Sequence, residues 1–284
     1  MTLAHALLLA LFALTILKAL TLKLCSIKLD QRTAPVFIGV WVLAGLAATW
    51  PFFHPLLSAG LHALAEKPYL LVLCILKGGL LYLTFVIGQE LMRDSLSSSN
   101  YVMPMAVGLI AIVNSTLGEH LHLSQWVSAL GLCALTAGFF FKGHLSDLSR
   151  EGKLAYVKLV LLSVALAGID QTVISHINWY ALLLVSNISM LSLSLILNRT
   201  RRWILRDALF HRSAVFAGVF FTVTELVKFY QQVTINPVTV ALTVQSAAAA
   251  AVLVLSALLW KERTVKEQLF WGVLAFIVTL PLFL

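Results

Sequence analysis

The chain has 284 residues, of which 60% are hydrophobic and only 11% are charged. An ordinary soluble domain carries about 25% charged residues, so this composition excludes a typical water-soluble globular protein. The net charge is +8, but the basic residues flank apolar runs and form no patch with interleaved aromatic side chains, which excludes a nucleic-acid-binding surface. The composition therefore predicts an integral membrane protein.

Ten predominantly apolar runs follow one another with short connections, and each is close to the roughly 20 residues that a spanning helix needs. The runs are continuous and about twice as long as a tilted barrel strand, so helices are expected and not a β-barrel. We predict an all-α polytopic membrane protein with ten transmembrane helices. In chain order they cover residues 2–22, 34–54, 69–92, 97–117, 124–142, 154–176, 179–198, 212–234, 237–259 and 266–284.

Basic residues are unevenly distributed over the connections between these helices. Fifteen Lys and Arg residues fall in the odd-numbered connections, and only Lys67 falls in the even-numbered ones. Connections rich in Lys and Arg stay in the cytoplasm, so both termini are predicted to lie outside. Lys18 and Lys158 lie within a turn or two of the cytoplasmic face, where their ammonium groups are expected to reach the lipid headgroups. The basic segment 199–212 is interpreted as a topology anchor, with binding of anionic membrane lipid as the alternative.

Two polar segments resemble each other across the chain. GEHLHLSQ, at 118–125, aligns with KERTVKEQ, at 261–268, with Glu on Glu and Gln on Gln at an offset of 143 residues. The same offset places Gln89 opposite Gln232, so helices three to five resemble helices eight to ten. The sequence therefore predicts an internal repeat.

The predicted repeats contain five helices each, at 1–145 and 146–284. An odd number of spans turns the second copy upside down in the membrane. Inverted repeats of this kind are a transporter architecture, with the substrate held near the midplane between the halves.

The stretches 89–140 and 232–283 resemble the EamA-type repeat of the drug/metabolite transporter superfamily. The resemblance rests on a small-residue apolar helix, a Gly-Glu pair and a following helix entered through a Gln. Lys261 stands where that family prefers Gly, and its members usually place both termini in the cytoplasm, whereas the charges here predict them outside. The resemblance implies a ten-helix permease of the plasma membrane, the inner membrane of a bacterium.

Four ionisable residues lie well inside predicted helices: Lys77, Asp170, Glu225 and Lys228. Each costs roughly 2.5–3.5 kcal/mol on insertion scales, so each is a candidate functional residue. At a rise of about 1.5 Å per residue, all four fall in the middle to outer half of the bilayer and could meet. Glu225 and Lys228 share one helix face and form either a self-neutralising pair or part of a substrate site. Asp170 is either the salt-bridge partner of Lys77 or a proton carrier.

Three uncharged polar residues extend the predicted substrate or coupling site. Gln232 continues the face that carries Glu225, and Gln245 precedes an Ala-rich run and can face the pore. Tyr82 falls opposite Glu225 under the repeat offset, which favours a cavity-wall residue, with a core tyrosine as the alternative.

The sequence contains no convincing catalytic constellation and no P-loop, so neither an enzyme nor an ATP-driven pump is expected. Glu119, His120 and His122 lack the spacing of a zinc site, and no metal or cofactor is predicted. Both histidines are expected on the outer surface. The three cysteines are scattered and are interpreted as packing residues.

These observations predict a secondary transporter that moves a small polar metabolite, anionic or zwitterionic, by alternating access. Proton coupling and facilitated exchange both remain open. The alternative is a flippase or an accessory subunit that handles a lipid-linked substrate. A small molecule and membrane lipid are the expected partners, nucleic acid is not, and a homodimer is left open.

Overall fold

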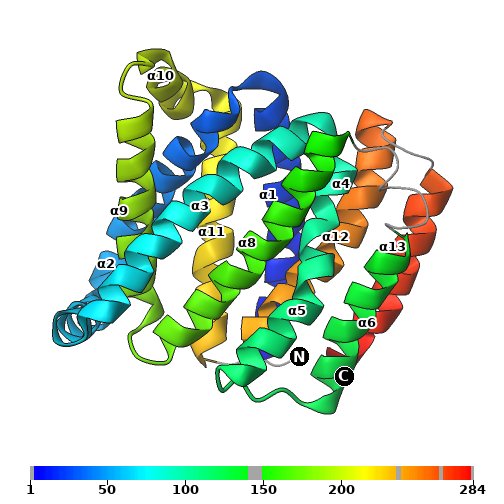
Figure 1. Ribbon diagram of the computed structural model, residues 1–284, viewed down its shortest axis with the longest axis horizontal. Coiled ribbons are helices and arrows are strands. Elements are labelled where there is room, and N and C mark those ends of the chain that lie inside the picture. Colours follow the sequence, from blue (N-terminus) through cyan, green and yellow to red (C-terminus); the bar gives the residue numbers. More distant parts are fainter. Residues whose placement is uncertain (1–2, 140–148, 235–237, 262–264, 283–284) are drawn as a thin grey trace.

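The computed structural model describes residues 3–139, 149–234, 238–261 and 265–282, and within these ranges every regular element is a helix (Figure 1). Two 3-10 turns, η1 (Gln31–Thr33) and η3 (Leu280–Leu282), accompany the α-helices. The α-helices are α1 (Leu3–Lys28), α2 (Ala34–Glu66), α3 (Pro68–Asp94), α4 (Leu96–Asn100), α5 (Val102–Thr116), α6 (Leu123–Phe139), α8 (Arg150–Ile174), α9 (Trp179–Leu197), α10 (Arg202–Phe210), α11 (Arg212–Thr234), α12 (Val238–Trp260) and α13 (Val265–Thr279).

Seven of the described helices are long and apolar enough to cross a membrane: α1, α2, α3, α8, α9, α11 and α12. They coincide with seven of the predicted runs and confirm the prediction of a helical membrane protein. The other three runs hold shorter helices, so ten spans remain a prediction. The run 97–117 is divided into α4 and α5 at Tyr101. Pro104 contributes to this break, because it offers no N–H to the Asn100 carbonyl four residues earlier.

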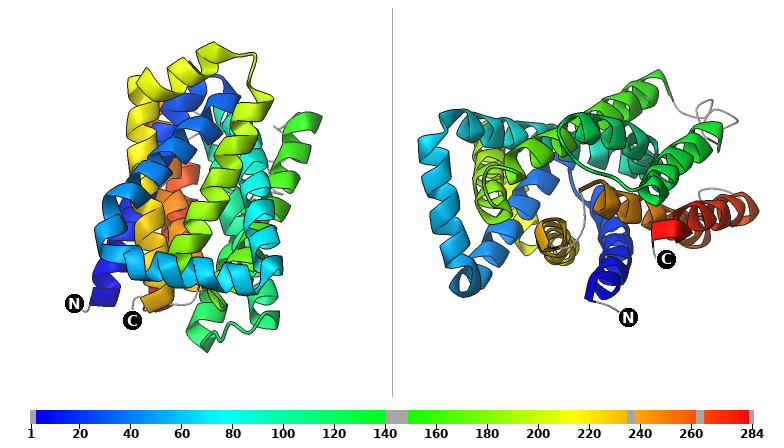
Figure 2. Two further views of the ribbon diagram at one scale, coloured as in Figure 1. Left: turned by 90° about the vertical axis from the view of Figure 1, so that its left-hand side faces the viewer. Right: turned by 90° about the horizontal axis from the view of Figure 1, so that it is seen from below.

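Helix α2 is longer than predicted, since it continues past residue 54 to Glu66. Pro51 and Pro55 lie inside it, and each removes a backbone hydrogen bond without ending the helix. Figure 2 shows the C-terminal part of α2 running across the end of the bundle. The Asn178 side-chain amide, at the start of α9, donates a hydrogen bond to the Leu56 carbonyl and ties this part of α2 to the bundle.

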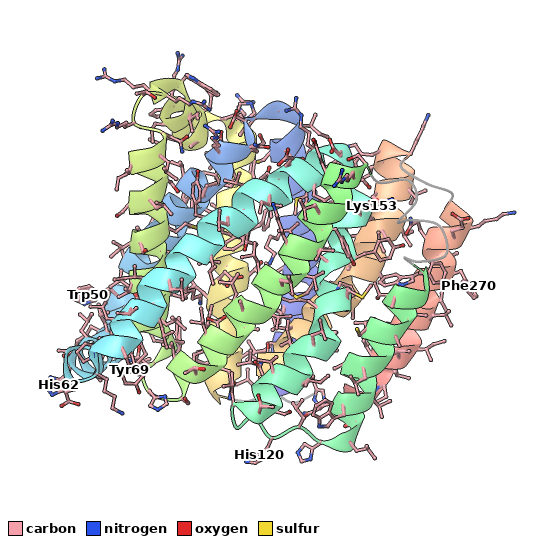
Figure 3. All side chains as sticks on the ribbon, in the orientation of Figure 1. Trp50, His62, Tyr69, His120, Lys153 and Phe270 are labelled. Atoms are coloured by element: carbon pink, nitrogen blue, oxygen red, sulfur yellow. The ribbon has the colours of Figure 1, made fainter. Side chains whose placement is uncertain are left out.

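The ends of the helices gather on two opposite faces. Helix α10 lies at one end of the bundle, together with Lys153 of α8 (Figures 1 and 3). The N-terminal end of α1 and the C-terminal end of α13 lie at the other end, where Figure 3 also places His62 and His120. The first and last described helices therefore have these ends on the face opposite the basic helix α10.

Helix packing follows a paired pattern. α1 packs against α11 and α12, and α8 packs against α3 and α5. α3 packs against α9, and α11 packs against α2. α5 pairs with α6, and α12 pairs with α13. Three further contacts join helices of the N-terminal part to helices of the C-terminal part: α2 with α9, α5 with α12 and α6 with α13.

Small residues allow some of these helices to approach each other closely. A Cβ atom at Gly78 of α3 would lie 2.5 Å from the Ser189 Cβ and 2.6 Å from the Ser186 carbonyl oxygen of α9. At the adjacent Gly79 a Cβ would meet nothing within 4 Å. Gly78 therefore allows α3 and α9 to touch, as small residues do between helices in lipid.

Helix α12 is the most buried of the seven long apolar helices that the structure describes. In its most apolar window 83% of the residues are buried, against 28–44% for the other six long apolar helices. The run of small residues from Ser246 to Ala251 lets neighbouring helices approach it closely. The other long helices keep much of their apolar surface exposed, as lipid-facing helices require.

Candidate functional site

A cavity of about 270 Å³ lies inside the bundle, lined by residues of α1, α3, α4, α5, α8, α9, α11 and α12. Small-molecule sites occupy roughly 300–1,000 Å³, so this cavity suits a small ligand. Most of its lining is apolar. The charged groups that line it are Lys18, Lys77, Asp170, Glu225 and Lys228.

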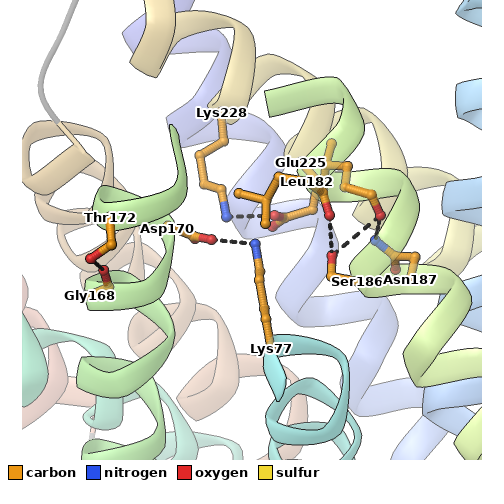
Figure 4. Close-up of polar contacts among 10 residues, drawn as sticks. Lys77, Gly168, Asp170, Thr172, Leu182, Ser186, Asn187, Glu225 and Lys228 are labelled. Carbon is orange, nitrogen blue, oxygen red and sulfur yellow. Dashed lines mark hydrogen bonds and ion pairs between the residues drawn. The ribbon is translucent and has the colours of Figure 1, made fainter. Parts of the chain in front are cut away.

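Lys77 and Asp170 form an ion pair between α3 and α8. The Lys77 ammonium donates a hydrogen bond to the Asp170 carboxylate (Figure 4), and the two residues are 3% and 7% exposed. Removing one partner of such a buried pair leaves an uncompensated charge and is strongly destabilising. The pair therefore fixes α3 against α8 at the level of the cavity.

Glu225 and Lys228 form a second ion pair on one face of α11, at 2.5 Å between the Glu225 Oε2 and the Lys228 Nζ. The Phe229 ring lies beside both pairs: its centroid is 4.8 Å from the Lys77 Nζ and 4.4 Å from the Lys228 Nζ. An aromatic face attracts cations at this distance. Two ammonium groups, each paired with a carboxylate, thus face one fully buried aromatic ring. Glu225 also interacts electrostatically with Lys77.

Three amide side chains, Gln89, Asn187 and Gln245, add polar groups to the cavity wall. Asn187 of α9 lines the cavity, and its side-chain amide donates to the Leu183 carbonyl at 2.9 Å (Figure 4). Gln245 of α12 also lines the cavity, and its Nε2 has no hydrogen-bond partner among the described residues. Since buried polar groups are normally paired, this amide is a donor available to a ligand.

The remaining predicted site residues are Tyr82 and Gln232. Tyr82 packs into the hydrophobic core and does not line the cavity, which agrees with the alternative of a core tyrosine and not with that of a cavity-wall residue. The repeat offset placed it opposite Glu225, but α3 turns its Lys77 face and not its Tyr82 face to the cavity. Gln232 belongs to α11, and its side chain lies outside the described residues, as does Glu262 of the second polar segment. The predicted boundary between the halves, at 145 and 146, also lies outside the described residues.

Lys18 was expected to reach the headgroups, and this prediction is wrong. Its ammonium lines the cavity, 5.2 Å from the centroid of the Phe221 ring. Helix α1 continues to Lys28, six residues beyond its predicted end, so Lys18 lies about 15 Å from the end of the helix. The polar residues after position 22 remain helical partly because the Lys23 ammonium donates to the Met92 carbonyl of α3 at 2.6 Å.

Glu119 links the two predicted halves. It is 7% exposed, and its carboxylate accepts hydrogen bonds from the backbone N–H of Thr239, at 2.9 Å, and from the Thr239 hydroxyl. A carboxylate in this place satisfies a free N–H at the start of α12 and complements the positive end of the helix dipole. His120 and His122 in the same turn are exposed. Glu119 therefore stabilises a helix end and does not form a common site with the two histidines.

No protein-family model matches the chain, and no curated protein matches its sequence. A solved structure, described only as the crystal structure of a protein, is similar to it with a TM-score of 0.59. The likeness covers 98% of this chain and 95% of the other at 13% sequence identity. At this identity it shows a shared fold alone.

Proposed function

We propose that the chain is a secondary transporter that moves a small polar metabolite, anionic or zwitterionic, by alternating access. The observation that carries the proposal is the pair of buried ion pairs, Lys77 with Asp170 and Glu225 with Lys228, beside one internal cavity. Ionisable residues inside a membrane are costly and mark substrate or ion pathways. Lys77 and Lys228 would hold an anionic group of the substrate. Asp170 or Glu225 would balance charge, meet an amine or carry a proton.

We further propose ten spans arranged as two inverted repeats of the EamA type. The helix contacts support this layout, because exchanging α1, α2, α3, α5 and α6 with α8, α9, α11, α12 and α13 reproduces the main contacts. The contact of α1 with α11 becomes that of α8 with α3, α3 with α9 becomes α11 with α2, and α5 with α8 becomes α12 with α1. The contacts of α2 with α9, α5 with α12 and α6 with α13 map onto themselves. A two-fold axis in the membrane plane has this property.

The charge distribution supports an orientation with α10 in the cytoplasm and both termini outside, in a plasma or bacterial inner membrane. The cavity continues from the ion pairs to Gln89, Met92 and Ser99, near the α10 end of the bundle. This lining supports an inward-facing state, in which the ion pairs close the path to the outside.

A flippase or accessory subunit that handles a lipid-linked substrate is the second candidate, favoured by the mainly apolar lining. The volume of about 270 Å³ favours a small metabolite, because a lipid with its chains is much larger. A homodimer is compatible with both candidates.

The proposal is tested in two steps with purified protein. A thermal-shift screen against metabolite classes identifies ligands, since a ligand at 100 times its Kd stabilises a protein by about 2.7 kcal/mol. Uptake of the best ligand into proteoliposomes then compares the wild type with Asp170→Asn, Glu225→Gln and Lys77→Ala. We expect loss of uptake per mole of folded, reconstituted protein, while Asp207→Asn on α10 serves as the matched control and retains uptake. Unchanged uptake in all three site variants would refute the site, and uptake of lipid-linked compounds alone would favour the second candidate.

A further inference from the structure

One cation in the cavity has no opposite charge of its own. Lys18 of α1 is half-buried and lines the cavity, with its ammonium over the Phe221 ring of α11. In the part of the chain that the structure describes, this ammonium makes no hydrogen bond and no ion pair. The other two cavity lysines each hold a carboxylate within bonding distance.

The charges that line the cavity therefore do not balance. Among the described residues, three lysines face two carboxylates, and both carboxylates are engaged by Lys77 and Lys228. Lys18 acts electrostatically on Glu225, and it also lies close enough to Lys228 for the two cations to repel each other. An uncompensated charge away from water is unfavourable, and one negative charge on a ligand would neutralise it.

The surroundings of Lys18 are apolar and partly aromatic. Phe85 of α3 and Phe221 of α11 meet edge to face, with their ring centroids 5.2 Å apart, and both line the cavity. Leu22, Met92 and Met103 line the same cavity. Polar side chains, among them Thr84, Gln89 and Ser163, also line the cavity, but most of its lining is apolar, so it matches an apolar body better than a sugar or a polyol.

We infer that the cavity binds a small organic monoanion with an apolar or aromatic body, whose anionic group binds the Lys18 ammonium and whose body packs against Phe85 and Phe221. The inference rests on the proposed transport function and narrows its substrate class. It excludes cations, because they would add to the uncompensated charge. It also excludes dianions, because their second charge would have to break an existing ion pair.

Three probes of one size test the charge requirement: 3-phenylpropanoate, 3-phenylpropanamide and 3-phenylpropylamine, which carry charges of −1, 0 and +1. The measurement is the saturable rise in the Tm of the detergent-solubilised full chain. We expect the carboxylate alone to raise the Tm. We expect Lys18→Gln to weaken its apparent affinity by about tenfold or more, since a hydrogen bond to a charged group contributes about 1.5–3 kcal/mol.

Two further variants separate the effect of losing the Lys18 charge from the effect of losing stability. Lys18→Arg keeps the cation and is expected to retain binding, and Lys158→Gln removes an exposed lysine outside the cavity and is expected to leave the affinity unchanged. The comparison of acid with amide in the wild type needs no variant. Equal stabilisation by the amide, no stabilisation by the carboxylate, or unchanged affinity in Lys18→Gln would overturn the inference. If the protein instead takes up a cation or a neutral compound, and Asp170→Asn abolishes that uptake, the proposed transport function would stand and the proposed anion site at Lys18 would be refuted.

Discussion

Substituting either partner of the Lys77–Asp170 ion pair should destabilise the protein, and the loss of stability should differ between the two residues. Breaking a buried pair costs about 3–5 kcal/mol, because the remaining charge is left in apolar surroundings. After Asp170→Asn, Lys77 keeps the Phe229 ring at 4.8 Å and the electrostatic attraction of Glu225. After Lys77→Met, Asp170 keeps no ion pair within the described residues. We therefore expect about 3 kcal/mol for Asp170→Asn and about 5 kcal/mol for Lys77→Met.

The double variant makes the prediction sharper. With both charges removed, only a buried amide without its partner remains, so the double variant should lose about 1–3 kcal/mol, less than the Lys77→Met variant alone. For a chain of this length 1 kcal/mol shifts the Tm by about 2 °C, which gives losses of roughly 6 °C, 10 °C and 2–6 °C for Asp170→Asn, Lys77→Met and the pair. Thermal unfolding in detergent measures all three. Additive losses in the double variant would refute the idea that the two residues stabilise each other.

Other parts of the fold give predictions with matched controls. Glu119→Gln should lower the Tm by about 2–6 °C, because it weakens two hydrogen bonds to a charged acceptor at the start of α12. His122→Gln in the same turn should leave the Tm unchanged. Equal effects of the two changes on the Tm would contradict the role of Glu119 at the helix end. Gly78→Ala should destabilise the contact of α3 with α9, while Gly79→Ala should stabilise α3 by about 0.5–1 kcal/mol, since it reduces chain entropy without a clash; the same sign for both changes would argue against this packing. A tag at Leu284 should be labelled from outside intact cells by an impermeant reagent, and labelling from the cytoplasm alone would reverse the proposed orientation.

The sequence was most informative about the site at positions where burying a side chain costs much free energy. The residues Lys77, Asp170, Glu225 and Lys228 were recognisable because charges are rare inside apolar helices. The Glu225–Lys228 pair could be derived from spacing alone, since both residues lie on one helix. The choice between Asp170 and a substrate as the partner of Lys77 required the crossing of α3 and α8, which no local pattern contains.

Other features were hidden because their partners are distant in the sequence. The end of α1 was predicted too early, since Lys23 reads as a solvent-exposed residue until the Met92 carbonyl is placed beside it. That error moved Lys18 to the membrane surface and removed it from the site. Phe229 gave no signal, because an aromatic residue in an apolar helix is ordinary until two ammonium groups face it. The role of Glu119 was also hidden, since nothing near it in the sequence indicates a bond to Thr239.

The C-terminal part of α2, which runs across the end of the bundle, has a consequence for how the protein sits in the bilayer. A helix of 33 residues is about 50 Å long, well beyond the roughly 30 Å of the hydrocarbon core, and this part carries the excess length across the bundle end. Phe52 and Leu61 in this part are 79% and 45% exposed, so it presents apolar side chains in the plane of the interface. We expect such a segment to anchor one end of the protein at a fixed depth in its leaflet. A thinner or thicker bilayer should then displace the opposite end of the bundle, which carries the arginines of α10.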